Sequence, residues 1–189
     1  MNEKKIAVLF PGIGYHNEKP LLYYSGKLLK EIGYEVLKIT YDFPFQANSI
    51  KGDAVQMKNA FDLAVRQTEK QLLAIDFSAY EKILFVGKSI GTTVAAAFDQ
   101  THGIGGKHII LTPVPQTFSR LNPECGIVFH GNADPWCETS LVIERCKDLG
   151  LLLHIIHDAN HSLETTSVLD DIRNMAEVLR LIREYAEQL

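Results

Sequence analysis

The chain has 189 residues, of which 46% are hydrophobic and 22% are charged, a composition typical of one folded globular domain spanning residues 1–189. Its net charge is −4 and it contains no clustered basic block, so we expect no nucleic-acid partner. It has three cysteines, no run of 18 apolar residues and no signal-peptide pattern, which predicts a cytoplasmic protein without a disulfide framework or a membrane segment.

Six short apolar runs alternate with longer segments along the chain. The runs are rich in Ile, Val, Leu and Phe and are nearly continuous, which is typical of strands buried on both faces of a parallel sheet. They cover residues 6–10, 34–39, 83–86, 108–111, 126–130 and 151–156.

The segments between these runs, and the segment after the last run, have apolar residues at helical spacing. We expect helices over residues 21–31, 54–74, 91–100, 138–149 and 170–187. The alternation predicts an α/β fold with about six mostly parallel strands, right-handed crossovers and helices on both faces. Active sites in such sheets lie at the carboxyl ends of the strands, so the loops there hold the candidate residues.

The third apolar run leads into Gly87-Lys88-Ser89-Ile90-Gly91, a G-x-S-x-G motif followed by a helix of small residues. This motif places a serine hydroxyl on a sharp turn above a sheet, where a side chain at position 87 or 91 would crowd the neighbouring backbone. Ser89 is therefore the candidate nucleophile. Two alternatives are weaker: Ser89 as a simple helix N-cap, and a phosphate-binding loop, which would need glycine at position 82, where this chain has lysine.

A serine hydroxyl becomes nucleophilic when a histidine takes its proton and a buried carboxylate orients that histidine. Asp134 lies in the loop after the fifth run, and Pro135 favours an extended backbone there. His161 lies in the loop between the sixth run and the last helix. We expect Asp134 to be the acid and His161 to be the base, against the alternatives of an ordinary Asp-Pro turn and a surface histidine.

The remaining histidines fit the role less well. His130 lies at a strand end, while His102 and His108 flank the start of the fourth strand, at the wrong edge of the sheet. A metal site of His154, His157 and His161 is disfavoured, because the first two would point to opposite faces of a strand. We expect no metal and no cofactor.

An acyl-transfer site also needs two backbone N–H groups to stabilise the oxyanion. We expect one from Ile90, directly after the nucleophile, and one from Ile13 in the glycine-containing loop after the first strand. The side chains and backbone expected around the substrate are those of Gly12, Tyr15, His16, Phe118 and Trp136.

Together the motifs resemble those of compact, lidless α/β-hydrolases, and are most similar to small dienelactone-hydrolase-like and carboxylesterase-like members. The matching segments are Phe10-Pro11-Gly12-Ile13-Gly14, Gly87-Lys88-Ser89-Ile90-Gly91, His130-Gly131-Asn132-Ala133-Asp134 and Asn160-His161-Ser162-Leu163-Glu164. The chain departs from the family in having Pro11 where many esterases have histidine, and a serine where dienelactone hydrolases have cysteine. It also lacks a sequence long enough for a cap domain after the fourth run, where residues 112–124 would form at most a short flap.

The resemblance implies a serine hydrolase that cleaves small soluble esters or thioesters through an acyl-enzyme on Ser89, with a small acyl compound as its partner. An acyltransferase or a C–C bond hydrolase would use the same three residues. A non-catalytic binding protein with this fold is the third hypothesis.

Overall fold

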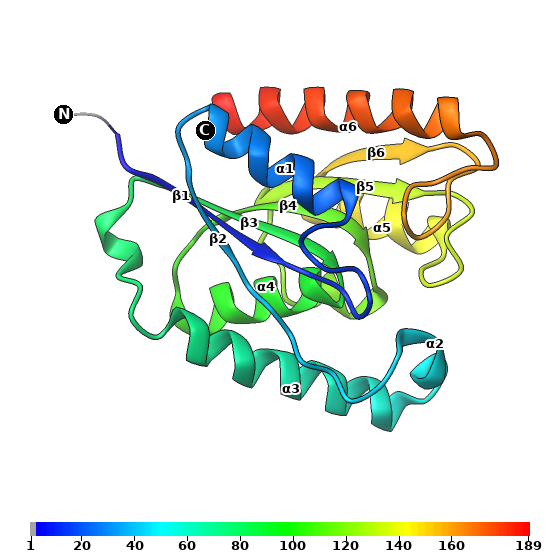
Figure 1. Cartoon of the computed structure of the whole chain (residues 1–189), viewed down its shortest axis with the longest axis horizontal. Helices are drawn as coiled ribbons and strands as arrows, with labels where there is room; N and C mark the ends of the chain where they lie inside the picture. Colours follow the sequence, from blue (N-terminus) through cyan, green and yellow to red (C-terminus); the bar gives the residue numbers. More distant parts are fainter. Residues whose placement is uncertain (1–2) are drawn as a thin grey trace.

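The computed structural model describes residues 3–189, with the side chains of all of these except residues 47 and 48 (Figure 1). Six strands form a single parallel sheet in the order β2-β1-β3-β4-β5-β6. The strands are β1 (Lys5–Phe10), β2 (Glu35–Lys38), β3 (Lys82–Ser89), β4 (Lys107–Pro113), β5 (Gly126–Gly131) and β6 (Leu152–Ile156). The predicted α/β fold with six parallel strands is confirmed.

Helices cover both faces of this sheet. They are α1 (Pro20–Glu31), α2 (Ala47–Ile50), α3 (Ala54–Leu72), α4 (Ile90–His102), α5 (Thr139–Leu149) and α6 (Val168–Glu187), with 3₁₀ turns η1 (Phe77–Ala79) and η2 (Pro115–Thr117). Helices α1 and α6 lie on one face, and α3, α4 and α5 lie on the other (Figure 1). No helix within residues 3–189 has both the length and the apolar character needed to cross a bilayer.

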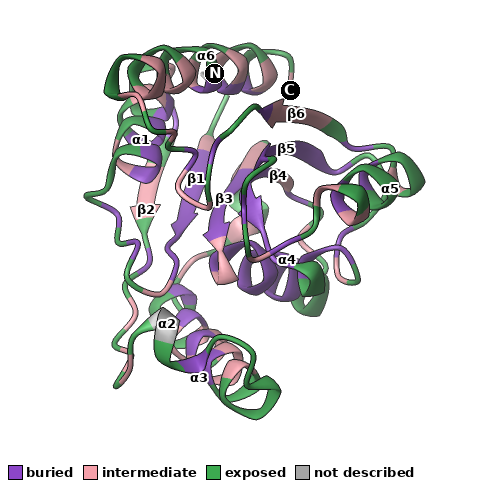
Figure 2. Cartoon of the chain, turned by 90° about the vertical axis from the view of Figure 1, so that its right-hand side faces the viewer, coloured by how far each residue is buried: buried purple, intermediate pink, exposed green. Residues whose placement is uncertain are grey.

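The near-continuous apolar runs are explained by burial on two sides. Along β3, Leu84 and Val86 pack toward α1 and α6, while Phe85 between them packs toward α3 and α4. Successive side chains of a strand point to opposite faces, so a strand covered on both faces needs apolar residues at every position. Figure 2 shows the central strands buried, whereas the edge strands β2 and β6 are partly exposed.

The connection between β2 and β3 differs from the expectation. The sequence predicted one long helix there, but the structure has the short helix α2 ahead of α3. Helix α2 lies beyond the carboxyl ends of the strands, and α3 runs back beneath the sheet from there (Figure 1). Helix α2 has only four residues, which is too short to produce a helical periodicity in the sequence.

The segment over residues 112–124 is packed onto the body of the protein. Thr117 and Phe118 are buried, and the Thr117 hydroxyl is 2.6 Å from that of Thr92 and 2.9 Å from that of Thr93 on α4. Phe118 and Leu121 belong to the apolar cluster between α4 and α5. The segment is therefore anchored to the body of the protein, and its residues Val114, Gln116 and Arg120 line the cavity described below.

Candidate active site

Ser89 is the last residue of β3, and α4 begins at the next residue. Its backbone has φ 57° and ψ −125°, a region that residues other than glycine rarely adopt. The Thr92 hydroxyl donates a hydrogen bond to the Ser89 carbonyl oxygen at 2.6 Å and holds the turn. This strained turn lifts the serine side chain out of the sheet plane at its carboxyl edge.

Both glycines of the motif are required by close backbone contacts. A Cβ on Gly91 would lie 2.1 Å from the carbonyl oxygen of Phe10, and one on Gly87 would lie 2.6 Å from the Cα of Thr92. The start of α4 is thus pressed against the end of β1 on one side and β3 on the other. Larger residues at these positions would push Ser89 out of place.

The structure brings the three residues proposed from the sequence together. His161 Nε2 is 2.8 Å from Ser89 Oγ, and His161 Nδ1 is 2.7 Å from Asp134 Oδ2. The other oxygen of Asp134 accepts a hydrogen bond from the backbone N–H of Trp136 at 2.8 Å. The three side chains therefore form one continuous chain of hydrogen bonds from hydroxyl to carboxylate.

The two loops that carry Asp134 and His161 are bonded to one another. The N–H of Ala133 donates to the carbonyl oxygen of Ala159, and the N–H of Asp158 donates to the side-chain oxygen of Asn132 at 2.6 Å. A Cβ on Gly131 would lie 2.2 Å from the Ala159 carbonyl oxygen, so only glycine allows this approach. These contacts fix the spacing between the acid and the histidine.

Burial sets the ionisation of the site. The Asp134 side chain is fully buried, while that of His161 is 18% exposed. Burial lowers the pKa of His161, and the hydrogen bond to Asp134 opposes that change. The imidazole is therefore neutral near pH 7 and can accept a proton from Ser89.

The loop after β1 lies beside the serine. Gly12 and Tyr15 exchange two backbone hydrogen bonds, at 3.1 and 3.3 Å, and Gly14 between them has φ 71°. Gly12 packs against Ser89, since an added Cβ would lie 3.1 Å from the serine Cβ. Ile13 and Ile90, the two expected oxyanion donors, both line the cavity next to Ser89.

That cavity has a volume of about 870 Å³. Of the expected substrate-contacting residues, Tyr15 and Trp136 line it. The Trp136 ring lies 5.6 Å from the His161 ring, measured between centroids.

Three expected pocket residues do not line the cavity, and the first is Gly12, which packs against Ser89 instead. Phe118 is only 5% exposed and packs in the core between α4 and α5, because η2 turns its side chain inward. His16 is exposed, and its Nδ1 accepts a hydrogen bond from the N–H of Glu18 instead.

One wall of the cavity was not predicted from the sequence. It consists of residues from the end of α2 and the start of α3, which we call the α2–α3 wall: Ile50, Gly52, Ala54, Met57, Lys58, Phe61 and Asp62. The Lys51 ammonium lies 5.1 Å from the centroid of the Trp136 ring, linking this wall to the loop that carries Asp134. No sequence motif marks these residues, because their role depends on the path of a long connection.

Sequence reasoning also missed Lys88. It occupies a variable position of the G-x-S-x-G motif and lines the cavity, yet the residue is only 1% exposed. Strand alternation could have indicated its burial. Residues 84, 86 and 88 lie on the same face of β3, and Leu84 and Val86 on that face pack toward α1 and α6.

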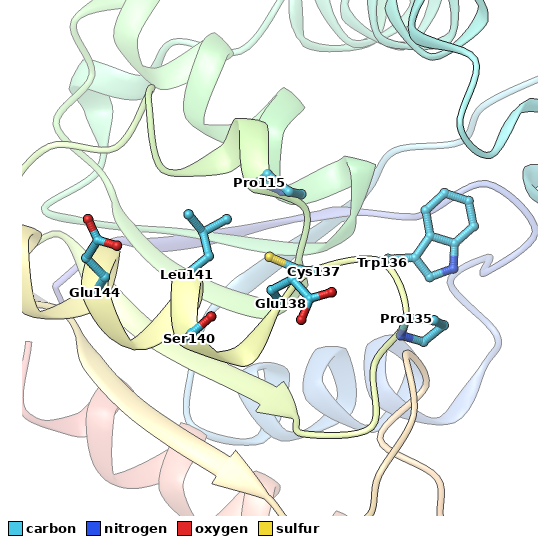
Figure 3. Close-up of a pocket in the computed structure, with 8 residues that line it drawn as sticks. All are labelled: Pro115, Pro135, Trp136, Cys137, Glu138, Ser140, Leu141 and Glu144. Carbon is cyan, nitrogen blue, oxygen red and sulfur yellow. The ribbon is translucent and has the colours of Figure 1, made fainter.

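A second, smaller hollow of about 390 Å³ lies on the other side of Trp136. It is lined by Pro115, Pro135 and residues of the α5 start, and Figure 3 shows Trp136 at one end and Glu144 at the other. It includes neither Ser89 nor His161. The larger cavity is therefore the one associated with the hydrogen-bonded triad.

No protein-family model and no curated protein matches the chain. Solved structures do match. A dienelactone hydrolase from Anabaena variabilis superposes with a TM-score of 0.68 at 16% identity, covering 97% of this chain and 86% of that one. Est1E from Butyrivibrio proteoclasticus gives 0.67 at 12% identity, with 100% and 89% covered.

A third similar structure comes from Xanthomonas campestris and is described as an α/β serine hydrolase without a lid. Its TM-score is 0.58 at 12% identity, and the match covers 98% of this chain and 86% of that one. Similarity at such low identity shows the fold and not the activity. The chain has the α/β-hydrolase fold, without a cap domain among the described residues.

Proposed function

We propose that the chain is a serine hydrolase that cleaves small soluble esters or thioesters. The observation that carries the proposal is the hydrogen-bond chain from Ser89 through His161 to Asp134, with distances of 2.8 and 2.7 Å, on a strained turn at the mouth of a cavity. A serine without catalytic function would need neither the strained backbone nor the buried carboxylate. The names of two of the similar structures, a dienelactone hydrolase and an α/β serine hydrolase, support the same reaction class.

The reaction proceeds in two halves. As Ser89 Oγ attacks the substrate carbonyl, its proton passes to His161 Nε2, and His161 then gives that proton to the leaving alcohol or thiol. A water molecule next loses a proton to His161 and attacks the acyl-enzyme. The proton returns to Ser89 Oγ as the ester bond breaks and the carboxylic acid is released.

Asp134 and two backbone amides have supporting roles in this scheme. Asp134 accepts a hydrogen bond from His161 Nδ1, which directs Nε2 at the serine and stabilises the imidazolium that forms. The N–H groups of Ile13 and Ile90 stabilise the negative charge on the carbonyl oxygen in each tetrahedral intermediate. The open cavity, and the lack of a cap among residues 3–189, favour small substrates over long lipids.

The test is labelling with a fluorophosphonate probe, followed by mass-spectrometric mapping of the modified residue and turnover of p-nitrophenyl esters. We expect modification of Ser89, and loss of both labelling and turnover in Ser89→Ala. Ser119→Ala is the matched control, because Ser119 is exposed and bonds only to the Gln116 carbonyl. Labelling that persists in Ser89→Ala would overturn the assignment.

The same experiment separates hydrolysis from acyl transfer. With an added alcohol acceptor, a hydrolase releases mainly the free acid, whereas a transferase forms the new ester. We expect the free acid to dominate.

A further inference from the structure

The cavity beside Ser89 has an excess of positive charge. Its lining contains Lys19, Lys58, Lys88 and Arg120, and Asp62 is the acidic residue among them. Lys58 pairs with Asp62 at 2.5 Å, whereas no carboxylate within residues 3–189 lies at ion-pair distance from the other three cations. Because the whole chain has a net charge of −4, this excess is a local feature of the cavity.

Two of these cations contact the same aromatic ring. The ammonium of Lys88 lies 4.8 Å from the centroid of the Tyr15 ring, and that of Lys19 lies 5.5 Å from it. Tyr15 is itself buried, and its hydroxyl accepts a hydrogen bond from the N–H of Leu21. An aromatic ring attracts cations but carries no net negative charge, so it leaves the repulsion between two ammonium groups uncompensated.

The burial of Lys88 makes this arrangement costly. Lys88 as a residue is only 1% exposed, so its ammonium has lost most of its hydration, and burial lowers the pKa of Lys88 to about 7. The charges around it are Asp134, which favours the ammonium form, Lys19, which opposes it, and Glu164, which favours it. Asp134 is already bonded to His161, and Glu164 is exposed in the loop after β6.

The Lys88 ammonium also lacks hydrogen-bond acceptors. Among the described residues, no side chain and no carbonyl group accepts a hydrogen bond from its Nζ. Its Nζ is not one of the fully enclosed side-chain atoms without a partner, which within residues 3–189 are Asn17 Oδ1, Ser25 Oγ, Thr112 Oγ1 and His130 Nδ1, so the ammonium reaches the surface of the cavity. Since Lys88 lines the cavity, a group that enters the cavity with a bound molecule can supply the missing acceptor and the missing negative charge.

We infer that the cavity takes a substrate with a free carboxylate in addition to its scissile ester, and that Lys88 and Lys19 bind that carboxylate beside the Tyr15 ring. The inference rests on the proposed hydrolase function and narrows its substrate class to half-esters of dicarboxylic acids and related anionic esters. A carboxylate accepts several charge-assisted hydrogen bonds, which are the stronger kind in proteins. The ester carbonyl then lies at Ser89, the residue next to Lys88 in the chain.

The first experiment compares two substrates that differ in one charge: p-nitrophenyl hemisuccinate and its neutral methyl ester. We expect the wild-type protein to favour the hemisuccinate in kcat/KM by about tenfold or more, because a charge-assisted hydrogen bond is worth at least that factor. The preference should fall about tenfold in Lys88→Met and fall also in Lys19→Met. Lys19 is exposed, so its replacement tests the site even where the buried Lys88 variant fails to fold.

The control is Lys70→Met. Lys70 is an exposed lysine on α3 and does not line the cavity, so its removal changes the net charge equally but should leave the preference unchanged. A preference that falls equally in Lys70→Met would reflect the overall charge of the protein and would overturn the inference.

The second experiment measures binding without turnover. Ser89→Ala protein is titrated calorimetrically with monomethyl succinate and with neutral dimethyl succinate. Tighter binding of the anion, lost in the Ser89→Ala/Lys88→Met double variant, supports the carboxylate site. Equal binding of the two compounds, or a wild-type preference for the neutral ester, overturns it.

The two experiments also distinguish this inference from the proposed function. If the neutral ester is hydrolysed and the anion gives no advantage, the hydrolase proposal stands and the carboxylate site falls. If Ser89→Ala binds the anion preferentially while the wild-type protein hydrolyses neither ester, the anion site stands and the hydrolase proposal falls.

Discussion

The cavity has two walls that differ in how they are built. The triad wall comes from the ends of β3, β5 and β6, where short hydrogen bonds and close glycine contacts tie each loop to the sheet. The α2–α3 wall is attached more loosely: residues 51–56 are all exposed, and the buried face of α3 begins at Ala60. Proton transfer tolerates little change in geometry, whereas substrate contact can be made by side chains on a less densely packed segment.

The largest effect expected from this comparison is at the triad wall. His161→Ala should lower kcat/KM by about 10⁴-fold, since the base that takes the serine proton is lost. The measurement is steady-state hydrolysis of a p-nitrophenyl ester. His157→Ala is the matched control, because this neighbouring histidine lies in the same loop, is exposed and, within residues 3–189, has one side-chain hydrogen bond, at 3.5 Å to Asn132. A loss below about tenfold in His161→Ala would contradict the proposed role.

A second change tests how tightly the nucleophile turn is packed. Gly91→Ala should lower the free energy of unfolding by about 3 kcal/mol, because its Cβ would lie 2.1 Å from a backbone oxygen that cannot move freely. Urea denaturation measures this free energy of unfolding. In the control, Gly26→Ala, the new Cβ meets the end of the Leu9 side chain at 3.0 Å, and the expected cost is below about 1 kcal/mol. Equal costs for the two variants would show that the turn is not specially constrained.

The pH dependence of kcat/KM tests the electrostatics of the triad wall. Burial lowers the pKa of His161 below 6.5, its ordinary value, so the imidazole stays neutral and active into mildly acidic solution. Activity toward a neutral ester should therefore decline only below the ordinary pKa of histidine, by about tenfold per pH unit once His161 is protonated. A decline that begins above pH 7 would indicate that the histidine is instead stabilised in its charged form.

The smallest effect is expected at the α2–α3 wall. Phe61 lines the cavity, and the Arg120 guanidinium lies 4.9 Å from its ring centroid. Phe61→Ala should raise KM about threefold to tenfold with little change in kcat, because it removes contact area that does not change during the reaction. Val55→Ala, at an exposed residue of α3 outside the cavity lining, should change neither constant. A fall in kcat as large as the rise in KM would mean that this wall also positions the reacting groups.

The sequence predicted the sheet well because strand burial leaves a local signal. The six apolar runs lie within or close to the six strands, and the expected helices 21–31 and 138–149 each end as the structure shows. Ser89, Asp134 and His161 were found from their places after apolar runs, since parallel strands bring their carboxyl ends to one edge. Their hydrogen bonding shows that this placement was sufficient to predict the contact.

Predictions about the cavity were less successful. Phe118 was expected near the substrate, but the η2 turn directs it into the core. His16 follows the expected oxyanion loop, yet it faces solvent. In both cases the segment lies near the site, but the side chain points away from the cavity. The direction of a side chain depends on the conformation of its turn, which residue type alone does not determine.

By itself, the sequence determined the order of the strands along the chain, the turn at Ser89 and the candidate partners of that serine, because periodicity and glycine placement act over a few residues. The tertiary structure decided which segment closes the cavity and what surrounds Lys88. Those features depend on contacts between residues far apart in sequence: Tyr15 meets Lys88 only after β1 and β3 have paired, and Phe61 faces the cavity only because α3 packs beneath the sheet.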